Sequence, residues 1–306
     1  MLEQIANFLA SDIRTAIPIL IAALGFIYSE RAGVVNIGAE GIMLIGALAG
    51  VVGSFYFGNA WYGALLAIIM GGLIALIFAV LTITGRGDQI VVGAAINILG
   101  LGLTTTMARV IFGVNTAPPK IDAFTNISIP IFSKIPVIGQ ALFNQNAITY
   151  ITYILVPVSY YILFKTEIGL KIRAVGEHPK ACDTVGISVY KIRYGTVIFS
   201  GMLAGLAGSY VSLGLLSFFT ENMIAGRGFI ALAVVIFGKY NPIGAFVAAL
   251  LFGAGNSLQF ILQASGAQIP FQFLLMVPYI LTIFALAGFV GKNKGPEASG
   301  VPYVKE

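Results

Sequence analysis

Long apolar runs, separated by short charged or turn-rich segments, make up most of the chain. Runs of this length predict membrane-spanning helices, and charges, Gly and Pro mark where each helix ends. The pattern predicts nine spans, at residues 13–28, 34–56, 61–84, 89–113, 147–164, 194–216, 228–238, 241–263 and 268–290. The first and the seventh are shorter than the roughly 20 residues that a helix needs to cross hydrocarbon. We expect these two spans to be tilted, broken or re-entrant.

The composition places these helices in a lipid bilayer. Of the 306 residues, 58% are hydrophobic and only 9% are charged, whereas about a quarter of the residues of a soluble domain are charged. Apolar runs of this length favour an all-α integral membrane protein over a β-barrel. Cys182 is the only cysteine, so no internal disulfide and no cysteine-based metal site can form. The net charge of +5 does not indicate a nucleic-acid partner, because the cations follow the loops between spans.

The distribution of Lys and Arg predicts the orientation. If the charged loop 165–193 lies in the cytoplasm and nine spans alternate, twelve of the 17 cations fall inside. Positive charge favours the cytoplasmic side, so we expect the N-terminus outside and the C-terminus in the cytoplasm, on the two sides of a plasma membrane. Residues 114–146, with scattered Pro and polar residues, are interpreted as an external loop that folds back on the membrane surface.

The same count of spans predicts a repeated architecture within one domain, residues 1–306. Four spans (13–113) precede the fifth, and four more (194–290) follow the loop 165–193 with the opposite orientation. Two inverted four-helix repeats around a fifth helix are an arrangement that many transporters use. The sequence support is weak, because "NIGAEGIMLIGAL" and "NPIGAFVAALLFG" share little beyond Gly-Ala followed by apolar residues.

The loop 165–193 is predicted to contain a short helix, roughly Pro179 to Val185. Pro179 suits a first helical turn, Gly186 can adopt the left-handed conformation that ends a helix, and Ser188 can cap the next helix. One interpretation is a surface helix in an ordinary positively charged loop. The other is a docking site for a subunit that supplies energy, because the chain lacks the G-x-x-x-x-G-K-[ST] phosphate-binding loop.

Three segments carry a resemblance to a known family. "GLKIRAVGEHPKACDTVGISVYKIRY", from Gly169, resembles the cytoplasmic coupling segment of ABC-importer permeases of the ribose and branched-chain amino acid type. "ERAGVVNIGAEGIMLIGA", Glu30 to Ala47, resembles the nucleoside-transporting branch of that family, whereas the sugar branch has Asp where Asn36 stands. "GRGFIALAVVIFGKYNPIGA", Gly226 to Ala245, is a third match, so the resemblance spans most of the chain. Many relatives have an additional helix before the one equivalent to 13–28.

The resemblance implies that the loop is a coupling helix that sits in a cleft of a separate ABC ATPase subunit. ATP would act through that subunit, and no cofactor would bind this chain directly. It also implies a second, distinct permease subunit and an extracellular substrate-binding lipoprotein that delivers the nucleoside. The residues assigned to ATPase coupling are Gly176, Glu177, His178, Pro179, Lys180, Ala181, Asp183, Gly186 and Ile187.

Polar residues inside the spans are candidates for a substrate path. Glu40 lies about ten residues into the second hydrophobic segment, counted from Arg31, and a carboxylate in hydrocarbon is costly. It either accepts hydrogen bonds from a neighbouring helix or broken backbone, which we favour slightly, or acts in substrate passage or gating. The polar candidates within spans either make hydrogen bonds between helices or line the path: Asn36, Asn97, Thr104, Asn256, Gln259 and Gln263. Phe218, near the outer end of the sixth span, either lines the entrance of the path or anchors the helix at the membrane interface.

Small residues in two spans predict close helix packing. Gly46 and Gly50, and Gly201 and Gly205, form G-x-x-x-G patterns in apolar helices. Such patterns let two backbones approach closely, either within the chain or, less expectedly, at a dimer seam.

The sequence therefore favours a permease subunit of a bacterial ABC importer for nucleosides. A stand-alone ion-coupled secondary transporter is an alternative, although Glu40 is the only acid deep in a predicted span. An ABC permease for sugars or branched-chain amino acids is another. No catalytic residue and no metal ligand is assigned, because the chain shows no nucleophile–base pair and no ligand cluster around its one His.

Overall fold

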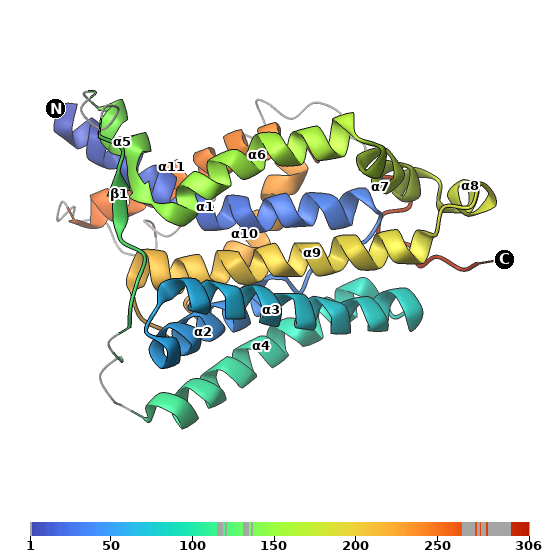
Figure 1. Ribbon diagram of the computed structural model, residues 1–306, viewed down its shortest axis with the longest axis horizontal. Coiled ribbons are helices and arrows are strands. Elements are labelled where there is room, and N and C mark those ends of the chain that lie inside the picture. Colours follow the sequence, from blue (N-terminus) through green and yellow to red (C-terminus); the bar gives the residue numbers. More distant parts are fainter. Residues whose placement is uncertain are drawn as a thin grey trace.

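The computed structural model describes residues 2–114, 119, 121–130, 135, 137–264 and 295–305, and the single positions 273, 276 and 280. Helices dominate this part of the chain, with one two-stranded sheet (Figure 1). The elements in chain order are α1 (Leu2–Arg31), α2 (Ala39–Phe57), α3 (Ala60–Ala79), η1 (Val80–Thr84), α4 (Gln89–Phe112), β1 (Asn126–Ser128), α5 (Ile138–Phe143), β2 (Asn144–Asn146), α6 (Ala147–Lys165), α7 (Glu167–Glu177), α8 (Pro179–Thr184), α9 (Val189–Tyr210), η3 (Val211–Leu216), α10 (Arg227–Phe237) and α11 (Pro242–Ala264).

Seven of the described helices are long and apolar enough to cross a membrane. They are α1, α2, α3 with η1, α4, α6, α9 with η3, and α11. The all-α, multi-pass character predicted from the sequence is confirmed. The predicted span 228–238 is the 11-residue helix α10, which is as short as expected. The predicted span 268–290 lies almost entirely outside the described residues, so the count of nine spans stays a prediction.

The prediction of a short first span was wrong. α1 runs for 30 residues, because polar side chains that interrupt its apolar run find partners on α11. Thr15 Oγ1 lies 3.2 Å from the Gly253 carbonyl oxygen, and Ser257 Oγ donates to Ser11 Oγ at 3.0 Å. Satisfied polar groups of this kind are tolerated inside a bundle, so the helix continues where hydropathy alone would end it.

The second span begins later than predicted. Residues 32–38 are not helical, and α2 starts at Ala39. Gly33 has φ +85°, a left-handed conformation that ends α1. Asn36 Oδ1 then accepts a hydrogen bond from the Gly38 N–H at 3.0 Å and holds a local turn.

Two long helices of opposite direction, α1 and α9, lie side by side at the centre of the bundle (Figure 1). α1 packs against α10 and α11, whereas α9 packs against α2 and α3. The buried core lines these contacts, and Phe26, Met43, Phe78 and Tyr210 are among its largest fully buried side chains.

The predicted glycine pairs pack inside the chain. Gly46 of α2 lies against Gly205 of α9, and Gly50 lies against Ser209. Gly201 and Gly205 also lie against Gly71 of α3. A Cβ at any of the four predicted glycines would collide with a neighbouring helix. Close intrachain packing is therefore confirmed, and the dimer-seam interpretation was wrong for these buried positions.

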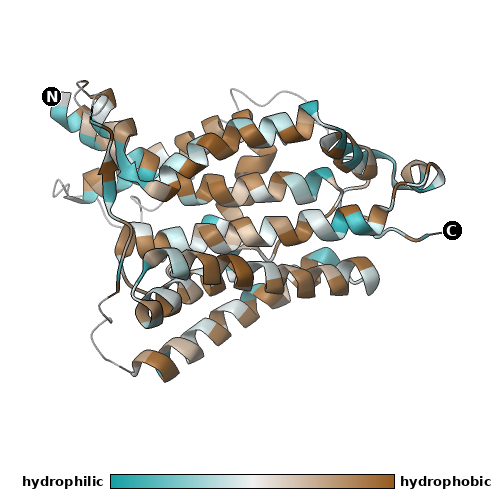
Figure 2. Cartoon of the chain, in the orientation of Figure 1, coloured by the Kyte–Doolittle hydropathy of each residue, from teal (hydrophilic) through white to brown (hydrophobic). Residues whose placement is uncertain are grey.

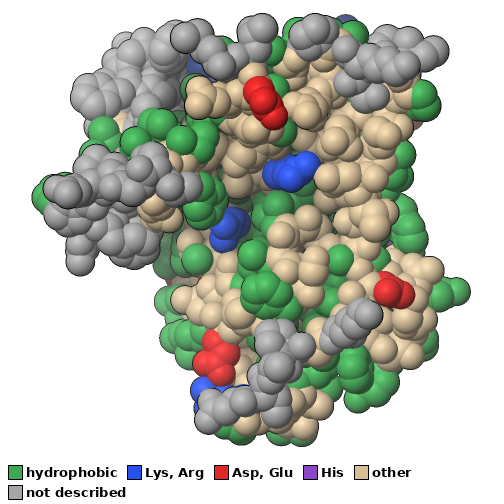
Figure 3. Space-filling view, turned by 90° about the vertical axis from the view of Figure 1, so that its left-hand side faces the viewer, with side chains coloured by type: hydrophobic (Ala, Val, Ile, Leu, Met, Phe, Trp, Pro, Cys, Tyr) green, Lys and Arg blue, Asp and Glu red, His purple; other side chains and the backbone are tan. Residues whose placement is uncertain are grey.

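The two ends of the bundle differ. One end carries α7, α8 and the C-terminal residues, and the other carries the N-terminus, α5 and the β1–β2 pair (Figure 1). Hydrophilic positions concentrate near both ends, whereas the middle of the bundle is mostly hydrophobic (Figure 2). Charged side chains are sparse on the face that the β1–β2 end presents (Figure 3).

The described part of the loop 114–146 forms the β1–β2 pair and contacts the ends of α2 and η3, whereas its place on the outer membrane surface stays a prediction. β1 and β2 are antiparallel, with Ile127 opposite Gln145. Ser54 Oγ at the end of α2 donates to the Asp122 carbonyl oxygen at 2.6 Å. The Phe124 N–H donates to the Leu213 carbonyl oxygen at 3.0 Å, which joins the loop to η3.

Candidate functional site

Glu40 caps the N-terminus of α10 from the first turn of α2. Its Oε1 accepts a hydrogen bond from the Gly226 N–H at 2.6 Å, and its Oε2 accepts from the Gly228 N–H at 2.7 Å. The first N–H groups of a helix have no partner inside that helix, and the positive end of the helix dipole favours a carboxylate. A Cβ on Gly228 would lie 2.8 Å from Glu40 Oε2, so this contact requires a glycine.

This geometry agrees with the hydrogen-bonding interpretation of Glu40. The Glu40 carboxylate accepts hydrogen bonds from backbone N–H groups at an interrupted helix, as this interpretation expects. These N–H groups belong to residues 226–228 and not to the surrounding "NIGAEG" segment. Because residues 32–38 are not helical, Glu40 lies in the first turn of α2 although it is about ten residues into the hydrophobic segment. Its role in substrate passage stays a prediction.

Asn97 of α4 holds the unwound segment in place. Its Oδ1 accepts from the Gly41 N–H at 2.8 Å, and its Nδ2 donates to the Ile37 carbonyl oxygen at 2.9 Å. Asn36 is fully buried, and its Nδ2 has no hydrogen-bond partner among the described residues. Glu40, Asn97 and Asn36 therefore form one polar junction where α2, α4 and α10 meet.

Arg227 brings a cation to the same junction. It is half-buried, and its Nη1 donates to the Met223 and Ile224 carbonyl oxygens at 3.2 and 2.9 Å. It also interacts electrostatically with Glu40. The opposite charges of these two side chains stabilise the meeting of two helix starts inside an apolar bundle.

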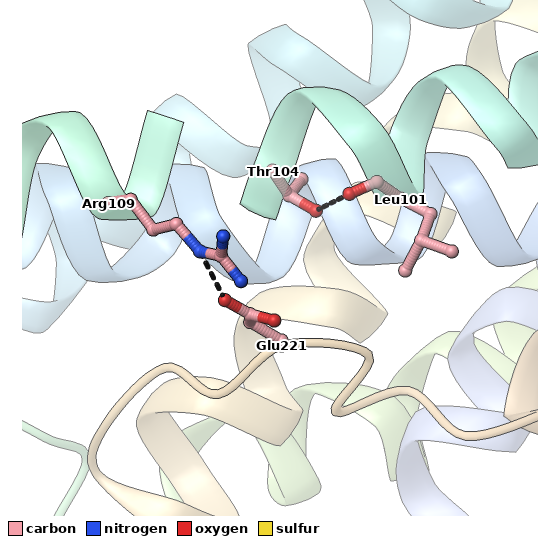
Figure 4. A network of polar contacts seen from close by, with 4 residues as sticks. All are labelled: Leu101, Thr104, Arg109 and Glu221. Atoms are coloured by element: carbon pink, nitrogen blue, oxygen red, sulfur yellow. Dashed lines mark hydrogen bonds and ion pairs between the residues drawn. The ribbon is translucent and has the colours of Figure 1, made fainter. Parts of the chain in front are cut away.

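An exposed ion pair joins α4 to the non-helical segment 217–226. Arg109 Nε of α4 lies 2.8 Å from Glu221 Oε1 (Figure 4). Thr104, on the same helix, is buried and donates to the Gly100 carbonyl oxygen at 2.7 Å, so its hydroxyl is used within α4. Phe218 is half-buried in the segment that carries Glu221.

The three polar residues predicted on the eighth span lie on that helix, α11, away from the junction around Glu40. Asn256, Gln259 and Gln263 belong to α11, which packs mainly against α1 and further against α6 and α10. Gln259 is buried, and the other two are half-buried. The structure does not join them to the junction around Glu40.

Two buried acids were missed by the sequence reasoning. Asp12, about a third of the way along α1, and Glu30, the last residue but one of α1, have exposed fractions of 8% and 4%, so Glu40 is not alone among the acids that the bundle buries. Both fall at the edge of the apolar run, where they look like boundary charges. Only the packing of α1 against other helices buries them.

The coupling loop folds as a helical hairpin, with α7 leading into α8. Pro179 occupies the first turn of α8, Gly186 has φ +82°, and Ser188 Oγ caps α9 by accepting from the Lys191 N–H at 3.5 Å. All three predicted signals are confirmed. α7 was not predicted; Thr166 caps it by accepting from the Gly169 N–H.

Most of the predicted coupling residues face solvent on this hairpin. The exposed ones are Glu177, His178, Lys180, Ala181 and Gly186, whereas Pro179, Asp183 and Ile187 are half-buried. Gly176 is buried, and a Cβ there would collide with the Arg31 carbonyl oxygen, so its role is to pack α7 against the end of α1. Burial raises the pKa of the Cys182 thiol, which faces inward from α8.

Spanning helices interrupted by two unwound segments, with a helical hairpin at one end, are the architecture of a membrane transport protein. The chain belongs to the family described as branched-chain amino acid transport system / permease component, whose model matches residues 8–286. It is therefore a transport component of the membrane and not an ATPase.

Named relatives cover nearly the whole chain. It is 46% identical to the guanosine ABC transporter permease protein NupQ of Bacillus subtilis, over 95% of this chain and 94% of that protein. It is 40% identical to the nucleoside ABC transporter permease protein NupC of Lactococcus lactis, over 94% and 93% of the two chains. A Haloferax volcanii protein provisionally named as a glucose ABC transporter permease is 38% identical, over 83% and 77%.

The first two organisms each contain a second, more distant relative. The guanosine ABC transporter permease protein NupP of Bacillus subtilis is 26% identical to this chain, and the nucleoside ABC transporter permease protein NupB of Lactococcus lactis is 25% identical. Relatives of this chain thus occur as pairs of distinct permease proteins.

Proposed function

We propose that this chain is the permease subunit of an ABC importer for nucleosides, and that a separate ATPase subunit docks on α8. The observation that carries the proposal is the short, exposed helix α8, held at one end of a membrane bundle whose relatives are named as ABC permeases. Membership of this family also argues against a stand-alone ion-coupled transporter.

A nucleoside suits the polar junction of the bundle. Nucleosides are neutral, so a path for them needs amides, hydroxyls and aromatic walls rather than a free charge. Asn36 offers an amide nitrogen that has no hydrogen-bond partner among the described residues, while Glu40 and Arg227 carry opposite charges that interact electrostatically. Two relatives at 46% and 40% identity carry guanosine or nucleosides in their names, and the glucose relative makes a sugar the competing substrate.

The proposal places the α7–α8 end in the cytoplasm. The ends of α1, η1 and α10 meet the starts of α9 and α11 at this end, as contacts such as Arg31 Nε to the Tyr240 carbonyl oxygen at 3.1 Å indicate. Of the 13 cations among the described residues, ten lie at the α7–α8 end, which favours the cytoplasmic side. They are Arg31, Arg86, Lys165, Lys171, Arg173, Lys180, Lys191, Arg193, Lys239 and Lys305. The N-terminus would then face outward and the C-terminus inward, across the plasma membrane.

The proposal also includes two inverted repeats. α1 and α9 run in opposite directions (Figure 1), and each is followed by an unwound segment and another helix, α2 or α10. The segments "NIGAEGIM" from Asn36 and "MIAGRGFI" from Met223 then align, with Glu40 opposite Arg227 and Gly41 opposite Gly228. The alignment pairs α2 with α10. The comparison of residues 36–48 with residues 241–253 would instead pair α2 with the start of α11.

In this mechanism, ATP binding and hydrolysis in the partner displace α8, and α7 and α9 carry the movement into the bundle. The two halves meet where Glu40 holds α10, so rocking there would open the path to alternate sides. A binding lipoprotein would supply substrate at the β1–β2 end. A second, distinct permease chain would complete the complex, as the paired relatives suggest.

Substrate-dependent ATPase activity of the reconstituted complex tests the proposed substrate. We expect stimulation by nucleosides and none by sugars or branched-chain amino acids, each tested with its own binding protein. Stimulation by glucose and not by nucleosides would show that the substrate is a sugar. Uptake that survives ATP depletion but collapses with the ion gradient would overturn the ABC mechanism.

A matched pair of glycine variants tests the docking site. Gly186 and Gly58 both have positive φ, +82° and +60°, and a Cβ at either would meet open space. Each Ala variant costs about 1 kcal/mol of backbone strain, but only Gly186→Ala lies beside α8. We expect Gly186→Ala, like Glu177→Gln, to weaken coupled ATPase activity while Gly58→Ala does not. Normal coupling in both Gly186→Ala and Glu177→Gln would contradict the assignment.

A further inference from the structure

The last described residues, Gly295–Lys305, form an extended C-terminal strap across the α7–α8 end of the bundle (Figure 1). The Ala298 N–H donates to the Gly176 carbonyl oxygen at 2.9 Å, and the Gly300 N–H donates to the Gly33 carbonyl oxygen at 3.2 Å. The strap is thereby fixed at the end of α7 and at the end of α1.

A buried arginine fixes the strap to α9. Arg193 is 1% exposed, and its Nη1 donates to the Val301 carbonyl oxygen at 3.0 Å. Its Nε donates to the Ala32 carbonyl oxygen at 3.2 Å. One guanidinium therefore connects the first turn of α9, the end of α1 and the strap. A buried cation is costly unless its donors are used, so the strap carbonyl is part of what makes Arg193 tolerable.

The strap also supplies the largest of the buried side chains in the cluster under α8. Cys182 is the one buried residue of α8, and it shares a buried cluster with Val175 of α7, Val189 of α9 and Tyr303 of the strap. Tyr303 is 6% exposed, and its ring centroid lies 5.6 Å from that of Tyr190.

Charged contacts repeat the same connection on the outside. Lys305 Nζ lies 3.7 Å from Asp183 Oδ1 of α8. The Glu297 N–H donates to Glu177 Oε2 at 3.3 Å, and Glu297 Oε2 lies 3.6 Å from His178 Nδ1. Exposed pairs of this kind add little energy, but here they mark both ends of the α8 segment as contacts of the strap.

We infer that the C-terminal strap is a positioning element for the coupling helix: Tyr303 braces α8 against α9, and the strap ties this brace to the ends of α1 and α7. The inference rests on the proposed docking of an ATPase subunit on α8. A six-residue helix with a single buried side chain holds its orientation poorly by itself. Because the strap joins α8 to α1 and α9, a push on α8 reaches the two central helices directly instead of bending a loose loop.

The native cysteine reports the state of the brace. Cys182 lies under α8, and burial raises the pKa of its thiol, so a maleimide should react slowly with the purified full-length permease. We expect Tyr303→Ala to accelerate this labelling by at least about tenfold, because loss of a buried ring opens the cluster. Tyr303→Phe, which keeps the ring, should stay close to wild type. Tyr62→Ala, a change of an exposed tyrosine on α3, is the control.

Binding of the ATPase subunit to the same four proteins completes the test. We expect Tyr303→Ala to weaken binding by at least about tenfold, with an unchanged thermal unfolding midpoint of the membrane bundle. Unchanged labelling of Tyr303→Ala would overturn the brace. Faster labelling with normal ATPase binding would overturn its positioning role. If the wild-type permease bound no ATPase subunit, the proposed function would fail, and the labelling rates would show separately whether the strap packs under α8.

Discussion

Replacement of Glu40 by Gln tests the junction between α2 and α10. The carboxylate accepts two backbone hydrogen bonds, from Gly226 and Gly228, at 2.6 and 2.7 Å. A Gln side chain keeps one acceptor oxygen but turns an NH₂ group toward the second N–H donor. Glu40→Gln therefore loses one charged hydrogen bond and leaves a half-buried N–H without an acceptor.

The expected loss of stability follows from these two effects. A hydrogen bond to a charged group contributes about 1.5–3 kcal/mol, and an unsatisfied buried donor costs about 1–3 kcal/mol. Since the two effects overlap and the site is only half-buried, we expect a total of about 2–4 kcal/mol. The start of α10 should loosen first, because its N–H groups lose their cap.

Thermal unfolding of the detergent-solubilised permease, together with nucleoside uptake in vesicles, measures both consequences. We expect Glu40→Gln to lower the unfolding midpoint and uptake together. Gly228→Ala should do the same, because its Cβ would displace the carboxylate. Glu3→Gln, at an exposed acid in the first turn of α1, is the matched control. Wild-type stability and uptake in Glu40→Gln would refute the capping role.

Two further predictions concern the neighbours of this junction. Asn97→Ala should remove two hydrogen bonds to the unwound segment and cost about 1–3 kcal/mol, measured as a lower unfolding midpoint, whereas Asn59→Ala at the exposed cap of α3 should cost less. Arg109→Glu should break the exposed ion pair with Glu221 and change substrate uptake at low salt, with little change in stability. The charge-swapped double variant, Arg109→Glu with Glu221→Arg, should restore wild-type uptake. Equal uptake by the wild type, Arg109→Glu and the charge-swapped double variant would show that this ion pair has no part in transport.

Local signals predicted the coupling hairpin well. Pro179, Gly186 and Ser188 each impose a backbone conformation within a few residues, so α8 and the start of α9 could be placed from the sequence. α7 was missed because its apolar residues, such as Ile172 and Val175, are interleaved with charges in a loop that hydropathy marks as polar. The C-terminal strap was missed because its contacts are made by one side chain, Tyr303, and by backbone groups, which leave no pattern in the hydropathy of the sequence.

The boundaries of the first two helices show the opposite limitation. An apolar run fixes where a helix can lie in lipid, but not where it ends inside a bundle. Ser11 and Thr15 extend α1 because α11 offers partners, and the residues before Ala39 unwind although they are apolar. The polar face of Asn256, Gln259 and Gln263 was a sound helical pattern, yet helical spacing alone gives no information about which neighbour a face meets.

The sequence by itself determined that this protein is a multi-pass helical membrane protein of a permease family, because hydrophobicity, turn residues and motifs act within short stretches of chain. Only the tertiary structure decided which polar groups meet. The carboxylate of Glu40 finds its donors 186 residues away, and Arg193 binds a strap carbonyl 108 residues away. In an apolar medium each polar group must have a partner, and the folding of the whole chain determines which partner it is.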